Sequence, residues 1–180
     1  MARTRLGLLA GWLAIALLGG CHARYSGPEL PVVPKVDLHR YAGVWYEIAR
    51  YPHRFQEGCY GSRATYTLRE DGRIGVLNEC RQGGPDGPRR TADGVAKVVD
   101  PVTNAKLKVS FFGPFYGDYW VIDLGPDYEY AVVGHPSRQY LWILSRTPDL
   151  PAQTYEAILA RLRSVGYDTQ RLIRADSSGR

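Results

Sequence analysis

The sequence lacks most of the motifs by which an enzyme is recognised. Its 180 residues include three cysteines and four histidines, and contain neither a Gly-x-Ser-x-Gly nor a Cys-x-x-Cys motif. These absences argue against a hydrolase with a nucleophile elbow and against a dithiol oxidoreductase. The histidines, at positions 22, 39, 53 and 135, are scattered along the chain and predict no metal site. No cofactor is therefore predicted.

A strong excess of charge of one sign is also missing. The chain has 23 lysines and arginines against 18 aspartates and glutamates, a formal charge of +5, and this falls to +3 without residues 1–20, which hold two arginines and no acid. So mild an excess gives no reason to expect a nucleic acid as partner.

The main apolar run is too short to cross a membrane as a stable helix. This run, Leu6–Leu18, follows Arg3 and Arg5 and leads into Gly19, Gly20 and Cys21. A basic start, an apolar stretch and small residues before a cleavage point are typical of a signal peptide. Residues 1–20 are therefore predicted to be removed.

The residues around Cys21 resemble a bacterial lipobox, which makes residues 1–20 a lipoprotein signal peptide. The resemblance implies that Cys21 becomes the N-terminus, is linked to diacylglycerol and is acylated, with palmitate as an expected acyl group. Several acyl chains together anchor a protein stably. Residue 22 is histidine rather than aspartate, which resembles an outer-membrane sorting signal. An ordinary secreted protein with a free Cys21 is the alternative.

Two further cysteines, Cys59 and Cys80, remain after cleavage. In an exported protein an even pair predicts a disulfide, with two buried free thiols as the alternative. The strand register expected below places Cys80 opposite Ser62, so that a regular strand points Cys59 to the other face. The bond therefore requires a break in the strand, for which Gly58 and Gly61 provide the means.

The rest of the chain is predicted to form a tether followed by one all-β domain. Residues 21–36 contain Pro28, Pro31 and Pro34 and predict an extended, semi-rigid tether after the lipidated cysteine. Eight short runs with strand character follow, separated by turns, and predict an eight-stranded antiparallel up-and-down barrel. The runs are Val44–Tyr51, Tyr60–Arg69, Arg73–Cys80, Thr91–Val99, Ala105–Phe112, Asp118–Leu124, Glu129–Gly134 and Gln139–Arg146.

One helix is predicted after these strands, from Asp149 as its cap to Gly166 as its stop. Its apolar residues recur at helical spacing and form one stripe, which we expect to pack on the outside of the barrel. The stripe consists of Tyr155, Ile158, Leu159, Leu162 and Val165. Thr169–Ile173 predicts a short final strand. The domain then spans residues 37–175, and residues 176–180 are predicted to be a disordered tail.

Alternation along the strands predicts which side chains face the interior. A hairpin turn over residues 70–72 places Tyr66 opposite Val76, and Asn78 opposite Ala64 on the same face. The predicted interior carries Tyr66, Asn78, Trp120 and Trp142. A mostly aromatic lining with a few polar groups suits an apolar ligand with a polar head. Rings that simply fill a small solid barrel are the alternative, since eight strands allow either.

The two ends of the strand region predict how the barrel closes. Gly43-Val44-Trp45-Tyr46 opens the first strand, and Arg146-Thr147-Pro148 ends the last. In a closed sheet Arg146 and Trp45 meet at one end, where a guanidinium over an indole contributes about 0.5–2 kcal/mol. This pair predicts a barrel with one sealed end and one open end.

Three blocks of sequence, Gly43–Pro52, Lys108–Phe115 and Tyr140–Pro148, resemble the lipocalins. Within that family they are similar to the bacterial outer-membrane lipoproteins and to the apolipoprotein-D-like branch, over about residues 35–175. The resemblance implies a barrel that holds a fatty acid or a lysophospholipid, for storage or transport in outer-membrane maintenance. It implies a protein anchored in the outer membrane through Cys21 and facing the periplasm, and it allows a homodimer.

The resemblance also implies roles for individual residues. Gly43, Trp45 and Arg146 form the structural signature, and five residues are predicted to contact the ligand: Tyr41, Tyr66, Asn78, Trp120 and Trp142. In the segment after the first strand, an anionic head group can meet Arg50, His53 and Arg54, with a solvated loop residue as the alternative for each of them. An enzyme of the same fold acting on a lipophilic substrate, and a purely structural envelope lipoprotein, are the alternatives.

Overall fold

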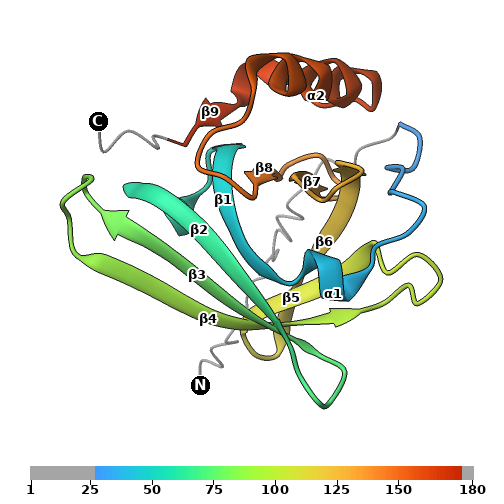
Figure 1. Cartoon of the computed structure of the whole chain (residues 1–180), viewed down its shortest axis with the longest axis horizontal. Coiled ribbons are helices and arrows are strands. Elements are labelled where there is room, and N and C mark those ends of the chain that lie inside the picture. The colour runs from blue at the N-terminus through green and yellow to red at the C-terminus, as the bar shows by residue number, and fades with distance from the viewer. Residues whose placement is uncertain (1–26, 176–180) are drawn as a thin grey trace, which may run out of the picture.

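The structure, a computed structural model, describes residues 27–175 (Figure 1). The predicted signal peptide, Cys21 and the tail 176–180 lie outside the described residues. The strands are β1 (Gly43–Arg50), β2 (Cys59–Leu68), β3 (Ile74–Gln82), β4 (Arg89–Val98), β5 (Lys106–Phe112), β6 (Phe115–Leu124), β7 (Tyr130–Gly134), β8 (Leu141–Ser145) and β9 (Ile173–Arg174). The helices are α1 (Leu38–Tyr41) and α2 (Ala152–Ser164), with short 3-10 turns η1 (Arg54–Gln56) and η2 (Thr169–Arg171).

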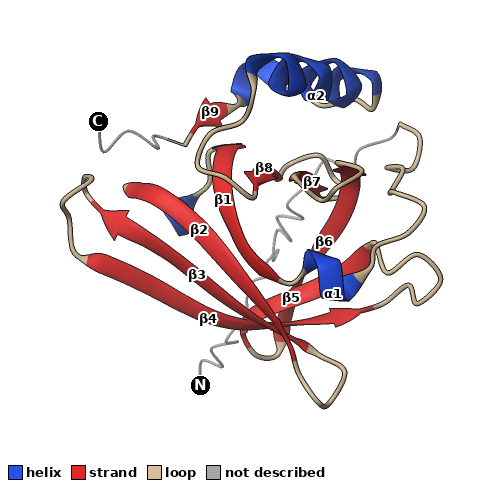
Figure 2. Ribbon diagram, in the orientation of Figure 1, coloured by secondary structure: helices blue, strands red, loops and turns tan. Residues whose placement is uncertain are grey.

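Strands β1 to β8 form a closed antiparallel barrel. Each pairs with the next along the chain, and β1 pairs with both β2 and β8. The short β9 joins β1 where Ala49 lies opposite Arg174. The barrel wall and the helix α2 outside it are visible in Figure 2. The predicted up-and-down barrel is confirmed, although β6 begins three residues earlier than expected.

The hairpin of β2 and β3 has the predicted register. Tyr66 lies opposite Val76, and Ala64 lies opposite Asn78. Gly72 has a φ of +76° in the turn, a conformation that glycine adopts without strain. Register and turn therefore agree, as expected for a hairpin whose turn fixes the pairing.

Cys59 and Cys80 form a disulfide, with their Cα atoms 5.4 Å apart. The register between β2 and β3 shifts between Tyr60 and Arg63. Gly61 lies within this irregularity and has a φ of +57°. The predicted break in the strand is confirmed, and the alternative of two free thiols is wrong.

The two ends of the barrel differ. We call open end the one from which the loops β1–β2, β3–β4, β5–β6 and β7–β8 emerge, and closed end the one that carries α1 and the other turns. The Asp37 carboxylate caps α1 by accepting hydrogen bonds from the backbone N–H groups of His39 (2.9 Å) and Arg40 (3.3 Å). The cap holds this short helix across the closed end.

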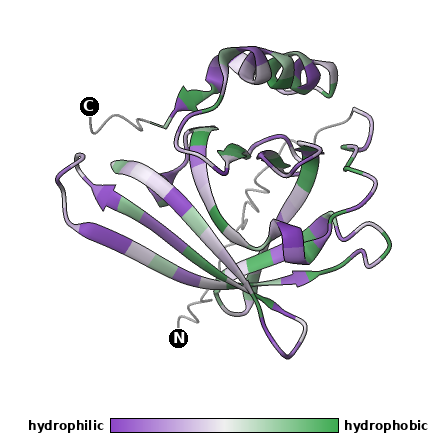
Figure 3. Ribbon diagram, in the orientation of Figure 1, coloured by the Kyte–Doolittle hydropathy of each residue, from purple (hydrophilic) through white to green (hydrophobic). Residues whose placement is uncertain are grey.

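Two apolar clusters stabilise the domain. Figure 3 shows both hydrophobic and hydrophilic residues along β3 and β4. The buried ones, among them Ile74, Val76 and Ala96, lie on the face that lines the barrel. The inner cluster fills the part of the barrel nearest the closed end. It includes Tyr41, Trp45, Tyr66, Val76, Ala96, Leu107, Val121, Val133 and Leu144. The outer cluster joins the barrel wall to α2 and includes Ile48, Tyr51, Val132, Leu141, Ile143, Tyr155, Ile158 and Leu162.

The helix α2 packs on the outside of the barrel, as predicted from its apolar stripe. It begins after Pro151 rather than after Asp149, and no side chain of the described residues 27–175 caps it. Arg161 ties it to the wall through an ion pair with Asp123 of β6, 2.6 Å long. Gly166, with a φ of +87°, ends the helix as expected. The predicted last strand is displaced, since residues 169–171 form η2 and only residues 173–174 are extended.

Residues 28–36 are packed rather than free, which corrects the predicted length of the tether. Leu30 and Val36 are fully buried, and the Val33 N–H donates to the carbonyl of Val121. Arg138 binds the carbonyl of Pro28 beside the β7–β8 loop, while Val36 binds Thr103 at the closed end. The segment therefore runs along the barrel from the open end to the closed end, and its apolar residues are the reason that it packs. Within the described part of the chain, no helix has both the length and the apolar character needed to span a membrane.

Candidate functional site

Trp45 and Arg146 seal the closed end. The guanidinium carbon of Arg146 lies 3.8 Å from the centroid of the Trp45 ring. Arg146 also donates hydrogen bonds to the carbonyls of Val44 (2.9 Å) and Arg40, which ties the end of β8 to β1 and α1. A Cβ atom on Gly43, whose φ is +97°, would lie 3.4 Å from this guanidinium. Glycine at this position therefore suits both the backbone and the arginine.

An apolar cavity lies inside the barrel, next to this seal on the side of the open end. Its walls consist of aliphatic side chains, among them Leu68, Ile74, Val76, Ala96, Leu107 and Val109, and of the tyrosines 41, 66 and 119. The hydroxyl of Tyr119 lies 2.7 Å from that of Tyr41 and 2.9 Å from that of Tyr66. Burial raises the pKa of Tyr66 to about 12 and also raises the pKa of the other two, so that all three stay neutral at physiological pH. This mainly apolar lining is suited to contact with a hydrocarbon chain.

The cavity is small in this conformation. The centre of a water molecule can move over about 10 Å³ in it, the room of about one water. A Cβ atom on Gly94 would lie 2.8 Å from the ring of Phe111, so this ring lies against β4. Nearer the open end, Arg90 and Ala92 lie on the inner face of β4, opposite Cys80 and Asn78 of β3. Arg90 and Ala92 are nevertheless exposed. The inner wall near the open end is therefore exposed to solvent, while side chains nearly fill the barrel near the closed end.

Trp120, predicted to line the interior, lies on the outer side of the barrel. It packs with Ile122 against the outer cluster. Lys106 Nζ lies 4.3 Å from its ring centroid. Tyr119 and Val121 belong to the inner cluster instead. The expectation that Trp120 and Ile122 share a face is correct, but the interior is the other face.

This error has a physical cause. Both faces of β6 are covered, the inner one by the barrel core and the outer one by α2 and residues 28–33. A strand buried on both faces has no polar side that identifies the interior. A bulge between Val121 and Asp123 then returns Leu124 to the inner cluster. For the same reason the sequence does not predict that Tyr119 faces the interior, because the residues on either side of it give no signal that separates the inner face of β6 from the outer face.

The other predicted ligand contacts lie in the interior. Tyr41 and Tyr66 line the cavity. Trp142 is half-buried against the inner cluster, and Asn78 is half-buried opposite Ala64. Their contact with a ligand stays a prediction.

A polar cluster lies above the cavity, on the inner side of β1 and η1. Glu47 Oε1 accepts a hydrogen bond of 2.6 Å from Arg50 Nη1, and the two side chains are 4% and 8% exposed. The Gln56 amide donates to Glu47 Oε2 (2.6 Å) and accepts from the indole N–H of Trp142 (2.9 Å). We call these four residues the inner polar cluster. Through Gln56 it joins the β1–β2 loop to β8.

The electrostatics of the inner polar cluster restrict its chemistry. Burial raises the pKa of Glu47, while the charge of Arg50 and the hydrogen bonds from Gln56 and Arg50 act against that rise. Each of the two carboxylate oxygens accepts one hydrogen bond, from Arg50 and from Gln56. Arg50 Nε is buried without a hydrogen-bond partner among residues 27–175. An oxygen of a lipid head group is one group that such a donor can bind.

His53 lies among aromatic rings beside this cluster. Its ring centroid is 5.2 Å from that of Trp142 and 5.6 Å from that of Phe55. Both ring nitrogens are buried and lack a partner within the described part of the chain. Burial, with a further contribution from the charge of Arg50, lowers the pKa of His53 to about 4. The ring is therefore neutral in the folded protein at pH 7, and Arg54, beside it, is exposed.

Acidification is expected to destabilise the protein through His53. Because the folded-state pKa of about 4 lies below the ordinary histidine pKa of about 6.5, the unfolded state takes up the proton first, and stability is lost as the pH falls from about 6.5 toward 4. His53→Phe keeps an aromatic ring and removes the titration. Urea unfolding of both proteins at about pH 7.5 and pH 4.5 measures the difference. We expect a smaller decline in the variant, and an equal decline would contradict this role.

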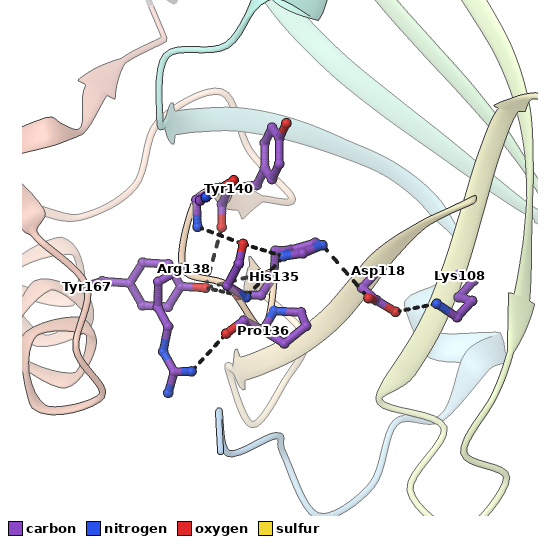
Figure 4. Close-up of polar contacts among 9 residues, drawn as sticks. Lys108, Asp118, His135, Pro136, Arg138, Tyr140 and Tyr167 are labelled. Atoms are coloured by element: carbon purple, nitrogen blue, oxygen red, sulfur yellow. Dashed lines mark hydrogen bonds and ion pairs between the residues drawn. The ribbon is translucent and has the colours of Figure 1, made fainter. Parts of the chain in front are cut away.

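The β7–β8 loop is held from two sides (Figure 4). The Tyr167 hydroxyl accepts from the backbone N–H of His135 and donates to the carbonyl of the same residue, both at 3.1 Å. His135 Nε2 lies 3.8 Å from Asp118, which pairs with Lys108 at 2.9 Å. The loop is thereby fixed to the segment after α2 by hydrogen bonds, and its His135 ring lies beside Asp118 of β6. In the part of the chain that the structure describes, no group of three His, Cys, Asp or Glu side chains is placed to hold a metal ion.

Comparison with known proteins agrees with this geometry. Residues 36–177 match the lipocalin-like domain family. The outer membrane lipoprotein Blc of Escherichia coli (strain K12) is 42% identical over 175 residues, which cover 97% of this chain and 98% of that protein. Apolipoprotein D of Mus musculus is 36% identical over 162 residues, covering 84% of this chain and 82% of that protein. The branches predicted from the three sequence blocks are thereby confirmed.

Solved structures show the same fold. Insecticyanin from the tobacco hornworm Manduca sexta superposes with a TM-score of 0.67, and the match covers 83% of this chain and 85% of that one. The two sequences are 23% identical, so this likeness supports the barrel and its outer helix alone.

Proposed function

The chain belongs to the lipocalin family, and from this premise we propose that it is a lipid-binding protein whose barrel holds one fatty acid or lysophospholipid. The observation that carries the proposal is the apolar cavity inside the barrel. Trp45 and Arg146 seal the barrel at the closed end, and the inner wall near the open end is exposed to solvent.

Binding would require the half-buried rings of Phe111 and Trp142 to move aside. Each methylene buried would contribute about 0.8 kcal/mol before the costs of association. The head group would remain near the inner polar cluster, where Arg50 Nε has no partner among residues 27–175 and where Asn78 lies on β3, two strands from β1. Tyr41, Tyr66, Tyr119 and Trp142 would contact the chain, while Trp120 is too far outside to do so.

We place the protein in the outer membrane, with Cys21 lipidated and the barrel in the periplasm. The lipobox-like sequence and the relatives named outer membrane lipoproteins support this location. A store or carrier of single-chain lipids at this site would serve maintenance of the membrane.

The small volume of the cavity favours a second candidate, a structural envelope lipoprotein with a filled barrel. Lipid uptake distinguishes the two candidates. We expect delipidated protein to take up a fluorescent fatty acid or a lysophospholipid saturably, with one site per chain.

A matched pair of variants tests where the lipid binds. Ala96→Phe places a phenyl ring in the cavity, because Ala96 lines it, and should reduce affinity by about tenfold or more. Thr91→Phe adds the same ring to the exposed outer face of the same strand and should leave affinity unchanged. Absence of saturable uptake by the unmodified protein would favour the structural candidate, and equal affinity of both variants would place the ligand outside the barrel.

A further inference from the structure

Exposed aromatic side chains lie on two of the connections at the open end, on opposite sides of the mouth of the barrel. Phe112 and Phe115 are 81% and 77% exposed, Phe55 is 70% exposed and Tyr116 is 41% exposed. We call these four residues the aromatic rim. They come from the β1–β2 loop and the β5–β6 hairpin, which both emerge at the open end. Large apolar groups exposed together mark a contact surface.

The β5–β6 hairpin extends beyond its neighbour on one side. Pairing of β6 with β5 continues to the tip, where Phe115 lies opposite Phe112. Pairing of β6 with β7 begins at Trp120, five residues further along β6. The tip therefore projects past the end of β7 and carries its rings outward.

The two ends of the barrel also differ in charge. The β1–β2 and β3–β4 loops and the strand ends beside them carry four exposed arginines, Arg54, Arg81, Arg89 and Arg90, against Glu57 and Asp86. The closed-end turns 69–73, 99–105 and 125–129, together with residues 35–41 that include α1, carry six acids against four lysines and arginines. An anionic surface is therefore attracted to the open end and not to the closed end.

The N-terminal segment leaves the barrel on the side of the open end. The carbonyl of Pro28 is held by Arg138 of the β7–β8 loop at 2.8 Å. Cys21 precedes Gly27 by six residues, a length of chain that spans at most about 20 Å. An anchor at Cys21 therefore keeps the open end within about this distance of the membrane.

We propose that the open end rests on the membrane surface, with the aromatic rim among the phospholipid head groups and the mouth of the barrel toward the lipid. Aromatic rings favour this interfacial depth, and arginines favour anionic lipid. The inference rests on the proposed anchor at Cys21. Contact of the rim with a second copy of the chain would bring the arginines of both copies together, so the membrane is the better match.

Photo-labelling tests this orientation. The full chain, purified with its N-terminal modification, is reconstituted in vesicles of phosphatidylethanolamine and phosphatidylglycerol that contain a phospholipid with a diazirine on its head group. We expect labelled peptides from residues 52–57 and 111–117. The double variant Phe112→Ser, Phe115→Ser should lose about threefold or more of the label at 111–117. The matched control Val99→Ser, Val102→Ser removes exposed apolar groups from the closed-end turn and should label as the unmodified protein does.

Each outcome of this experiment decides the proposal. Label at the rim that depends on Phe112 and Phe115 supports it. Label at the closed-end turns, label unaffected by the variant, or cross-links between two rims would overturn it. Label confined to cavity residues would show that the barrel binds lipid but that its open end does not rest on the membrane, and this would also overturn the proposal. Lipid uptake by the delipidated protein, measured separately, tests the proposed lipid binding independently of this orientation. Mass spectrometry of the N-terminal peptide shows independently whether Cys21 carries the anchor.

Discussion

Replacing Trp45 by alanine is expected to lower the free energy of unfolding by about 3–5 kcal/mol. The ring is fully buried, and Arg146 stacks on it at 3.8 Å. Its N–H donates to the carbonyl of Tyr41 at 2.8 Å, and the ring contacts that tyrosine at a centroid distance of 5.0 Å. The substitution would therefore leave a cavity, an unpaired carbonyl and a guanidinium without its aromatic partner. Urea unfolding followed by circular dichroism measures the loss.

Trp120→Ala is the matched control, because it makes the same truncation on the outer side. Trp120 is half-buried and lies beneath Lys106, so we expect a loss of about 1–2 kcal/mol. Trp45→Phe should fall between the two alanine variants, since it keeps a ring under Arg146 but loses the hydrogen bond to Tyr41. If the two alanine variants were equally stable, Trp45 would not have the sealing role assigned to it.

Arg50→Met is expected to cost about 3–5 kcal/mol at neutral pH, because it leaves the Glu47 carboxylate buried without its countercharge. Arg50 Nη1 lies 2.6 Å from that carboxylate, and both side chains are largely buried. The remaining partner, Gln56, supplies one hydrogen bond but no charge. The free energy of unfolding from urea titrations measures this loss as well.

The loss in Arg50→Met should depend on pH in a defined direction. Burial already raises the pKa of Glu47, and removal of Arg50 removes a charge that opposes this rise. The folded state then holds a proton that the unfolded state releases, so the penalty grows as the pH rises above the ordinary glutamate pKa of about 4.3. We expect a smaller loss at pH 5 than at pH 8. Glu47→Gln combined with Arg50→Met should recover most of the stability, and a double variant as unstable as the single one would refute the buried pair.

The barrel itself could be predicted because its signals are local. The turn at residues 70–72 fixed the register of β2 and β3, and with it the inward positions of Tyr66 and Asn78. The same register required a break near Gly61, and the structure has one. Each of these inferences needed only the period of a strand and the geometry of one turn.

The site was less predictable, because it depends on what covers each face. Trp120 and Tyr119 are both aromatic neighbours on β6, and only the packing of α2 and residues 28–33 outside the barrel decides which one faces in. The position of Gln56 between Glu47 and Trp142 joins three segments distant in sequence. The cavity volume depends on the rotamers of rings such as Phe111, which sequence periodicity does not encode.

The segment 28–36 also determines how the domain bears mechanical load. A force applied at its N-terminal end meets first the hydrogen bond between Arg138 and Pro28 and the buried side chain of Leu30. These contacts attach to the β7–β8 loop and the outer cluster, while the Trp45–Arg146 seal lies at the far end of the barrel. A pull on the N-terminal end of this segment would thus load the outer wall before it reached the Trp45–Arg146 seal.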